Sequence, residues 1–431
     1  MRPAARVVAA IDVISEILDR GRAASIVLSD WARANRFAGS ADRAAIGNLV
    51  YDALRKKQSL AYAMSDERPR ALTLAVLARQ WELPLSEIEA LCSGVGFAPA
   101  PLTNDERQGL LRTDLTDAPP WVRGDYPEWL HTSFSEVFGA DAVLEGAALS
   151  ERAPVDLRVN TLKSTPEKVL KALDRHHPEF TPYSPIGVRL PARKGAARSP
   201  NVEADAGHAR GWFEIQGEGS QLAALLAGAA PRLQIADICA GSGGKTLALS
   251  AVMQNTGQIY AYDADPTRFR PIFDRLKRAG ARNVQTLPAG REAALAALKD
   301  RLDLVLIDAP CTGTGVWRRR PDAKWRLTSA QLAERQSAQR QLLGTAASLL
   351  KAGGRLAYIT CSVLPEENSV RIQDFLQHNS EFSPVDLISE APRTLFEKLA
   401  SQPAKARHGI LLTPHTFGTD GFFISVLRKL G

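Results

Sequence analysis

Cysteine is scarce in this sequence. Four cysteines occur in 431 residues, and no two of them form a CxxC pair: Cys92, Cys239, Cys311 and Cys361. That spacing argues against a zinc ribbon and against a disulfide framework. Unpaired cysteines are typical of a reducing compartment. We therefore expect a cytoplasmic protein with no metal site.

Long apolar runs are missing as well. None approaches the roughly 20 apolar residues that a membrane-spanning helix needs. Asp12 and Glu16 interrupt the N-terminal stretch where a signal peptide would have its apolar region. With 45% hydrophobic and 23% charged residues, the composition is that of a soluble globular protein. We expect a monomer of two or three domains with no membrane partner.

Acidic residues are too few to balance the basic ones in the second part of the chain. Residues 1–150 carry 16 Lys and Arg against 20 Asp and Glu, a net charge of −4. Residues 151–431 carry 38 against 27, a net charge of +11. This basic excess indicates a polyanionic partner, most commonly a nucleic acid. Solubility alone is the competing explanation.

The periodicity of apolar residues divides the chain into three parts. Residues 1–145 show helical spacing, for example at Val7 and Ile11, and predict an all-α bundle. Residues 146–226 mix a strand-like segment with short helical ones and predict a small α+β module. Residues 227–431 alternate apolar runs with helical patterns, which predicts a Rossmann-like α/β domain with a mostly parallel sheet.

Strand-like runs in the third part end at five positions: Cys239, Asp263, Leu287, Asp308 and Thr360. Helical patterns lie between these runs, including residues 266–279 and 328–351. The chain closes with residues 410–415 and 421–427, which we expect to form an antiparallel pair at the edge of the sheet.

Two of the cysteines follow strands that should be neighbours. The runs LDLVLIDAPC and GRLAYITC end at Cys311 and Cys361, with a helical pattern between them. Strand, helix and strand form a right-handed crossover, so both cysteines lie at carboxyl ends, the edge where parallel sheets bind ligands. Two thiols at one edge indicate a site, although two buried structural cysteines would give the same pattern.

A glycine-rich loop, DICAGSGGKT, follows the first strand. A Walker A loop would need a glycine where Cys239 stands, and a dinucleotide fingerprint would need one where Thr246 stands. S-adenosylmethionine needs only a tight turn and close backbone approach at a helix N-terminus. Three glycines provide this: Gly241, Gly243 and Gly244. Asp263, at the end of the second strand, can accept hydrogen bonds from ribose hydroxyls, so the pair of features favours an adenosyl cofactor.

Two thiols have separate uses in one reaction, methylation of the 5-carbon of cytosine. That carbon is too weak a nucleophile to take a methyl group unaided, so a thiolate first adds to the 6-carbon while an acid near N3 takes up the charge. A base then removes the 5-proton and the thiolate leaves. Cys361 precedes a helix expected near Pro365, a position that favours a thiolate. Asp308 lies three residues before Cys311, so one turn can present both to the base.

A basic segment with two tryptophans, GVWRRRPDAKWR, occupies residues 315–326. Cations there can hold phosphates while aromatic rings stack bases. We predict RNA contacts from residues of this segment and of the middle module: Arg318, Arg319, Arg320, Lys324, Trp325, Arg158 and Asn160. The alternative is a solvated loop with two packed tryptophans.

Six segments together resemble the RsmB/Sun (Fmu) class of RNA 5-methylcytosine methyltransferases: RVNTLK, FEIQGEGSQLAA, DICAGSGGKT, DAPCTGTGVWRRRPDAKW, TCSVLPEENS and TDGFFIS. Residues 1–145 resemble the NusB-like domain of its bacterial ribosomal RNA branch. The resemblance implies transfer of a methyl group from S-adenosylmethionine to the 5-carbon of a cytosine in ribosomal RNA, from the small subunit. The alternatives are a transfer RNA substrate and a non-catalytic RNA-binding or ribosome-assembly factor that keeps the fold.

The resemblance also implies residue roles. Cys361 would be the nucleophile, Cys311 would assist release of the methylated base, and Asp308 would contact the cytosine ring. The cofactor would be bound by the glycine loop and its neighbours: Cys239, Ala240, Gly241, Ser242, Gly243, Gly244, Lys245, Asp263, Arg268 and Asp308.

Two positions depart from the pattern of the class. Ser242 stands in the cofactor loop where the class usually has proline. After the third strand, Ala289 stands where the class usually has an aspartate near the adenine. The lost acceptor is expected to weaken cofactor binding without abolishing it, since a neutral hydrogen bond contributes about 1 kcal/mol net.

Overall fold

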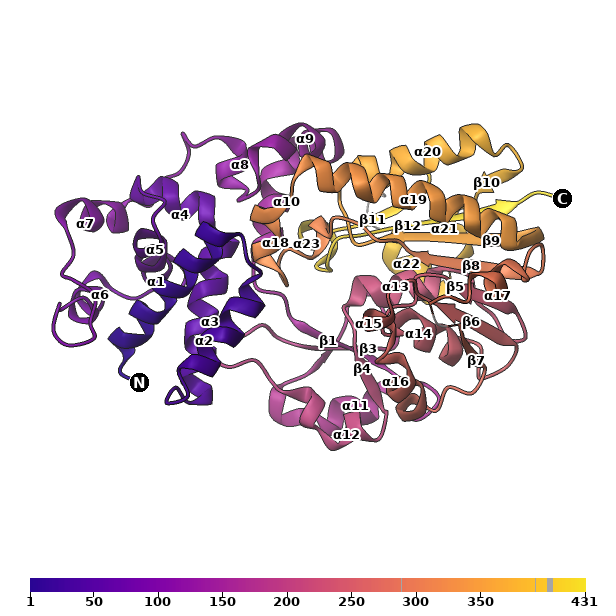
Figure 1. Cartoon of the computed structure of the whole chain (residues 1–431), viewed down its shortest axis with the longest axis horizontal. Helices are drawn as coiled ribbons and strands as arrows, with labels where there is room; N and C mark the ends of the chain where they lie inside the picture. The colour runs from indigo at the N-terminus through magenta and orange to yellow at the C-terminus, as the bar shows by residue number, and fades with distance from the viewer. Residues whose placement is uncertain (288, 392, 401–405) are drawn as a thin grey trace. The chain divides into compact units, whose positions relative to one another are not determined.

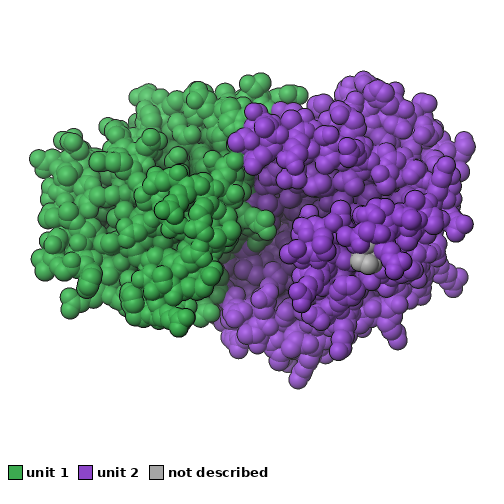
Figure 2. Space-filling model, viewed as in Figure 1, with its two compact units in different colours: residues 1–153, 192–199, 317–327 green, residues 154–191, 200–316, 328–431 purple. Residues whose placement is uncertain are grey.

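The computed structural model describes residues 1–287, 289–391, 393–400 and 406–431 (Figure 1). The chain forms two compact units, which Figure 2 draws in different colours. The first, here called the helical unit, comprises three segments: Met1–Ala153, Ala192–Ser199 and Trp317–Leu327. The second, here called the sheet unit, comprises the other three: Pro154–Pro191, Pro200–Val316 and Thr328–Gly431.

The helical unit is built around one helix that is apolar on all sides. In α5, seven consecutive residues from Ala71 to Leu77 are buried, which is typical of a central helix. It packs against α1, α3, α4, α6 and α7. The helices of this unit are α1 (Pro3–Arg20), α2 (Ala24–Ala34), α3 (Ser40–Arg55), α4 (Lys57–Met64), α5 (Pro69–Arg79), α6 (Leu85–Leu91), α7 (Asn104–Leu111), α8 (Pro120–Arg123), η1 (Glu128–Leu130), α9 (His131–Phe138), η2 (Gly139–Asp141), α10 (Ala142–Leu149) and α18 (Pro321–Arg326).

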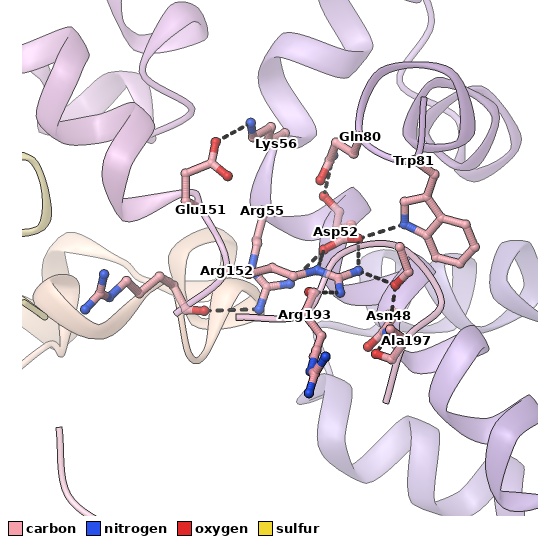
Figure 3. A network of polar contacts seen from close by, with 12 residues as sticks. Asn48, Asp52, Arg55, Lys56, Gln80, Trp81, Glu151, Arg152, Arg193 and Ala197 are labelled. Atoms are coloured by element: carbon pink, nitrogen blue, oxygen red, sulfur yellow. Dashed lines mark hydrogen bonds and ion pairs between the residues drawn. The ribbon is translucent and has the colours of Figure 1, made fainter. Parts of the chain in front are cut away.

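Within the helical unit, an ion-paired network joins residues 192–199 to α3 and to Arg152 (Figure 3). Arg152 donates from Nε to Asp52 Oδ1 at 2.8 Å, and its two terminal nitrogens donate to the carbonyls of Arg193 and Gly195 at 2.7 and 2.8 Å. Asn48 Nδ2 donates to the Gly195 carbonyl at 2.9 Å. These side chains satisfy the backbone of a segment that has no strand or helix partners of its own.

The smaller sheet of the sheet unit is antiparallel throughout, in the order β2–β3–β1–β4. Its core is formed by Leu157, Val159, Val188 and Phe213 with the helix α11. The elements of this part are β1 (Val155–Val159), α11 (Pro166–Ala172), η3 (Asp174–His176), β2 (Glu179–Phe180), β3 (Gly187–Leu190), η4 (Val202–Ala204), α12 (Ala206–Ala209) and β4 (Phe213–Ile215).

The larger sheet follows the order β10–β12–β9–β8–β5–β6–β7, and β11 pairs with β12. Five neighbouring strands pair in parallel: β9, β8, β5, β6 and β7. The pairs made by β12 with β9, β10 and β11 are antiparallel. The expected closing pair exists, but β12 lies inside the sheet rather than at its edge because β10 and β9 flank it. The strands are β5 (Gln234–Asp237), β6 (Gln258–Tyr262), β7 (Val284–Leu287), β8 (Leu302–Asp308), β9 (Leu350–Thr360), β10 (Phe382–Pro384), β11 (Ile410–Leu412) and β12 (Phe422–Lys429).

The helices of this sheet follow the predicted alternation, with one interruption. The predicted helix at 266–279 is divided into α15 and α16, because Pro271 cannot donate a backbone hydrogen bond. α19 begins at the capping box of Thr328 and Gln331 and packs against β8 and β9. The helices are α13 (Glu218–Leu226), α14 (Gly244–Val252), α15 (Pro266–Phe269), α16 (Ile272–Ala279), α17 (Glu292–Ala296), η5 (Thr314–Val316), α19 (Ser329–Leu349), η6 (Pro365–Glu367), α20 (Ser369–His378), α21 (Leu387–Glu390), α22 (Arg393–Ala400) and α23 (Pro414–Phe417).

The chain is thus multidomain, with helices and a mostly parallel sheet, as predicted. The boundaries at residues 145 and 226 and the NusB-like character of the bundle stay predictions; the helical unit itself runs to Ala153. In the part of the chain that the structure describes, no helix is both long enough and apolar enough to cross a membrane.

Candidate active site

Two thiols meet at the carboxyl edge of the large sheet. Cys311 follows β8 and Cys361 follows β9, and their Sγ atoms lie 3.4 Å apart. The two strands pair in parallel as far as Asp308. The prediction that one crossover brings both cysteines to one edge is therefore confirmed. Cys92, in contrast, is part of the core of the helical unit.

The two cysteine loops are bonded to each other. The Gly315 amide donates to the Cys361 carbonyl at 2.9 Å, and the hydroxyls of Thr314 and Ser362 lie 3.0 Å apart. The Gly421 amide, just before β12, donates to the Gly315 carbonyl at 2.7 Å. A Cβ on Gly315 would lie 2.2 Å from the Gly421 carbonyl oxygen, so only glycine allows this approach.

The two loops hold Cys311 as a neutral thiol. The hydrogen bond with Cys361 and burial raise the pKa of the Cys311 thiol well above its ordinary value. Burial likewise raises the pKa of Cys239, which lies in the glycine loop after β5. A thiol kept protonated can carry a proton but is a weak nucleophile.

A cavity of about 440 Å³ lies where the strand order reverses, between β5 and β8. In open α/β sheets this reversal opens a crevice for ligands at the carboxyl ends of the strands. Eight of the ten predicted cofactor residues line the cavity: Cys239, Ala240, Gly241, Ser242, Gly244, Lys245, Arg268 and Asp308. Five residues that were not predicted line it as well: Ile215, Gln216, Ser220, Asp237 and Arg275.

Asp237 gives the cavity a buried acceptor without a donor. Its Oδ2 accepts a hydrogen bond from the Thr246 hydroxyl at 2.7 Å, while its buried Oδ1 has no hydrogen-bond partner among the described residues. Burial raises the pKa of Asp237 to about 7, and the neighbouring Asp308 adds to the rise. An ammonium group in the cavity would supply the missing donor, so the site fits the amino-acid end of S-adenosylmethionine.

Asp263 and Gly243, the other two predicted cofactor residues, shape the loop. Asp263 accepts hydrogen bonds from the amides of Gly241 and Asp265 at 2.8 and 2.9 Å. Gly243 has a φ of +85°, and a Cβ on it would lie 2.6 Å from Ile272 Cγ1. Neither residue lines the cavity, and contact of Asp263 with ribose stays a prediction.

Ser242, the first departure from the class, has a partner of its own. Arg275 donates from Nη1 to the Ser242 hydroxyl at 2.7 Å and to its carbonyl at 3.0 Å. Glu214, which is 2% exposed, pairs with Arg275 at 2.9 Å and with Arg278 at 2.7 Å. A side chain that proline would lack is thus used to hold the loop.

Ala289, the second departure, lies half-buried after β7. Its neighbour in the chain, Gly290, donates its amide to Glu292 Oε1 at 3.1 Å, and the Tyr262 hydroxyl donates to the same oxygen at 3.0 Å. A hydrogen bond from its own backbone amide lowers the pKa of Glu292 most, and the bonds from Tyr262 and Gly290 lower it further. The turn is thereby held by Glu292, three residues beyond the missing acid.

Lys245 and Asp308 connect the cavity to the cysteine loops. Lys245 is 5% exposed and pairs from Nζ with Asp308 Oδ2 at 2.7 Å. The Asp308 side chain is 38% exposed and lines the cavity three residues before Cys311. The Lys245 ammonium thus contacts one oxygen of the Asp308 carboxylate, the group predicted to contact cytosine, and leaves the other oxygen to the cavity.

The structure corrects the RNA-binding prediction for much of the basic segment. Trp325 donates to the Leu54 carbonyl at 2.6 Å, and Arg318 is 6% exposed. Lys324 is fully buried, and its ammonium donates to three oxygens of the helical unit: Arg55 O, Asp125 O and Ser150 Oγ. An ammonium with three protein acceptors has no donor left for a phosphate. Arg319 and Arg320 are exposed, and their RNA contacts stay a prediction.

Arg158 and Asn160 are corrected in the same way, because both side chains are buried. Arg158 donates to the Gln216 side chain and to the Gly244 carbonyl beneath the cofactor loop. Asn160 Nδ2 donates to the carbonyls of Gly211 and Ala279 at 2.9 and 2.8 Å. Both residues connect the small sheet to the large one rather than facing a substrate.

The order of the sheet, the glycine loop after β5 and the cavity at the reversal define the class of protein: a methyltransferase with a Rossmann-like domain. Residues 225–428 match the family model "16S rRNA methyltransferase RsmB/F", and residues 126–195 match its ferredoxin-like domain. The ribosomal RNA small subunit methyltransferase B of Erwinia tasmaniensis is 30% identical to the chain over 97% of each protein. The chain therefore belongs to the RsmB/F family of 16S rRNA methyltransferases, which makes it an S-adenosylmethionine-dependent RNA methyltransferase.

Solved structures agree on the fold. The crystal structure of PH0851 superposes with a TM-score of 0.74 at 24% identity, covering 100% of this chain and 99% of that one. A methyltransferase homologue from Pyrococcus horikoshii has a TM-score of 0.58 at 27% identity and covers 74% of this chain and 100% of its own.

Proposed function

We propose that this protein transfers a methyl group from S-adenosylmethionine to the 5-carbon of a cytosine in small-subunit ribosomal RNA, through a covalent adduct with Cys361. The observation that carries the proposal is the pair of thiols 3.4 Å apart, beside a carboxylate that lines the cofactor cavity. Two thiols and an acid are the groups that this reaction requires.

Cys361 opens the reaction as a thiolate that forms a bond from sulfur to the 6-carbon. The electron pair of the 5,6 double bond moves toward N3, which takes a proton from Asp308 in its carboxylic acid form. Lys245 Nζ contacts only Oδ2 of Asp308, so the other oxygen can carry that proton to the ring and take it back when the methylated base is released. When bound, S-adenosylmethionine supplies the methyl group that the activated 5-carbon takes up.

Release reverses the first step. A base takes the proton from the 5-carbon, the carbon–sulfur bond breaks, and the electron pair returns to Cys361 as a thiolate. Cys311 lies against the Cys361 sulfur, where its proton can pass to or from the departing group. This division of labour between the thiols rests on the resemblance, and the loop geometry agrees with it.

Two substitutions test the proposal. Cys361→Ala should abolish methyl transfer to 16S rRNA while cofactor binding, measured by calorimetry, stays intact. Cys311→Ala should form the adduct and fail to release it, which gives a slow protein–RNA band on a denaturing gel. Full activity of Cys361→Ala would refute the nucleophile, and absence of the band would refute the release role.

Ala289 favours a second candidate, a non-catalytic RNA-binding or ribosome-assembly factor, because it stands where the class usually has an aspartate near the adenine. Calorimetric titration with S-adenosylmethionine separates the two, since a factor of that kind should take up none. Bisulfite sequencing of ribosomal and transfer RNA from a deletion strain identifies the substrate, and loss of a methylated cytosine in transfer RNA alone would exclude ribosomal RNA.

A further inference from the structure

Two consecutive buried residues, Glu367 and Asn368, lie at the end of η6 just beyond the cysteine loops. They are 0% and 3% exposed, respectively. Neither lines the cofactor cavity, and neither has a part in the reaction described above. Buried polar side chains cost free energy unless their hydrogen bonds are met, so their partners indicate what they hold.

Glu367 holds the chain on both sides of Cys311. Its Oε1 accepts hydrogen bonds from the Thr312 amide at 2.9 Å and from Gln339 Nε2 at 3.0 Å. Its Oε2 accepts one from the Thr312 hydroxyl. Gln339 Nε2 also donates to the Pro310 carbonyl at 3.0 Å. One carboxylate, directly and through one amide, therefore fixes the residues before and after the thiol.

Asn368 holds the chain on both sides of Cys361. Its Oδ1 accepts a hydrogen bond from the Thr360 hydroxyl at 2.6 Å, and its Nδ2 donates to the Ser362 carbonyl at 2.9 Å. The Tyr358 hydroxyl donates to the backbone carbonyl of Glu367 at 2.8 Å, which anchors η6 to β9. Each thiol thus has its own buried clamp, from adjacent residues: Glu367 ends η6, and Asn368 lies between η6 and α20.

We infer that Glu367 and Asn368 are positioning residues that set the spacing of the two thiols, Glu367 acting on release through Cys311 and Asn368 acting on attack through Cys361. The inference rests on the proposed covalent mechanism. Consecutive Cα atoms are held about 3.8 Å apart by the planar peptide. The two clamps therefore cannot drift apart, and the sulfur atoms they serve stay in contact.

The charge of Glu367 agrees with this assignment. The hydrogen bond with Cys361 and burial are the main causes that raise the pKa of Cys311, and the Glu367 carboxylate adds to the rise. Burial raises the pKa of Glu367 itself, and the hydrogen bonds from Thr312 and Gln339 oppose that rise.

Two single variants compare the effect of each clamp on attack with its effect on release. Glu367→Gln keeps the shape of the side chain, but its NH2 group replaces the oxygen that accepts from the Thr312 hydroxyl. Asn368→Asp keeps the oxygen that accepts from Thr360 and loses the NH2 group that donates to the Ser362 carbonyl. Alone, Glu367→Gln should lower kcat by about 100-fold, the scale of a 1 Å misplacement, and accumulate adduct with KM for S-adenosylmethionine unchanged. Asn368→Asp should lower kcat without accumulation.

Double variants make the distinction sharp. Glu367→Gln in the Cys311→Ala background should form adduct at the same rate as Cys311→Ala alone, because the residue it serves is already gone. Asn368→Asp in that background should form adduct at least tenfold more slowly. Equal slowing of both double variants, or of neither, would overturn the inference while the adduct of Cys311→Ala still supports the proposed function.

Oxidation of the two thiols needs no catalysis, so it tests the positioning role even if the proposed covalent mechanism is wrong. Diamide oxidises two adjacent thiols to a disulfide and is itself reduced to the hydrazine, and the Cys311–Cys361 disulfide can be followed by mass spectrometry. The wild-type pair should react fast, and Glu367→Gln and Asn368→Asp should each slow it about tenfold. Ser250→Ala is the matched control, since Ser250 is buried and bonded to Asn283 Oδ1 at 2.7 Å away from both loops. Unchanged oxidation in both clamp variants would refute the positioning role, whether or not an adduct exists.

Thr312→Val provides a second route if Glu367→Gln does not fold. It removes the hydroxyl that Glu367 accepts from and leaves the carboxylate bonded to the Thr312 amide and to Gln339. It should reproduce the accumulation of adduct in milder form. Normal release in Thr312→Val would count against the clamp.

Discussion

Two lysines of this chain are almost equally buried, and their surroundings give them different tasks. Lys324 in the helical unit is 0% exposed and Lys245 in the sheet unit is 5% exposed. The ammonium of Lys324 donates to three oxygens of its own unit: Arg55 O at 2.9 Å, Asp125 O at 2.6 Å and Ser150 Oγ at 2.7 Å. Lys245 pairs with a carboxylate that faces a cavity.

Saturation of donors, rather than burial, separates a structural cation from one at a functional site. Burial lowers the pKa of Lys324 to about 7, and the neighbouring Asp125 carboxylate opposes the fall. The three hydrogen bonds of Lys324 are all made inside the helical unit. At Lys245 the partner, Asp308, is itself partly open, so a ligand can alter the pair.

Removing Lys324 should have the largest effect on stability. Lys324→Met keeps the length of the side chain but leaves buried oxygens without a donor, which costs about 3 kcal/mol of unfolding free energy. Urea unfolding of the full chain measures it. Arg320→Met, an exposed cation of the same segment, is the control and should change stability by no more than about 0.5 kcal/mol. Equal losses in the two variants would remove the contrast between the lysines.

Removing Lys245 should affect activity and spare stability. Lys245→Met deprives Asp308 of a charge-assisted hydrogen bond, so kcat/KM for methyl transfer should fall by about 10- to 100-fold, equivalent to about 1.5–3 kcal/mol. The unfolding midpoint should move less than in Lys324→Met. Lys277→Met, at an exposed lysine of α16, should change neither quantity. A Lys245 variant that unfolds as readily as the Lys324 variant would show that both lysines are structural.

Asp237 extends the comparison to a buried acid with one oxygen unsatisfied. Its pKa of about 7 lies above the ordinary value of 3.8 because of burial. Between about pH 4 and pH 7 the folded protein holds a proton that the unfolded chain releases, so this residue lowers stability as pH rises through that window. A ligand ammonium needs the carboxylate, and binding should therefore strengthen over the same rise.

The measurement is calorimetric titration with S-adenosylhomocysteine at pH 6 and pH 8. A group with a pKa near 7 should make binding about tenfold weaker at pH 6 than at pH 8. Asp237→Asn should bind weakly at both values and lose the difference. A tenfold difference that persists in Asp237→Asn would assign the titration to another group.

Local geometry explains which parts of the site were predictable from the sequence. The carboxyl ends of β8 and β9 had to meet because a crossover makes neighbouring strands parallel, and that placed Cys311 and Cys361 together. The burial of Lys324 and Arg158 could not be predicted in this way, because the sequence is the same whether a basic side chain donates to water or to backbone oxygens. Asp237 was visible as the first residue of the glycine loop, but its unpaired oxygen is a property of the packed cavity. For Arg275 no local signal existed, since its partners lie 33 and 61 positions earlier in the chain.

Ser242 offers the smallest and most selective test. Arg275 donates to both the hydroxyl and the carbonyl of Ser242, and its remaining nitrogens stay paired with Glu214. Ser242→Ala removes one of these bonds and leaves Arg275 in place. Affinity for S-adenosylhomocysteine should therefore fall about two- to fivefold, less than the roughly 1.5–3 kcal/mol of a full hydrogen bond to a charged group, because Arg275 keeps its other partners. Arg275→Met should cost more, because it also leaves the buried Glu214 with one cation fewer. If Ser242→Ala weakened binding as much as Arg275→Met, the hydroxyl itself would have to contact the ligand, and Ser242 would belong with Lys245 among the residues whose partner lies outside the protein.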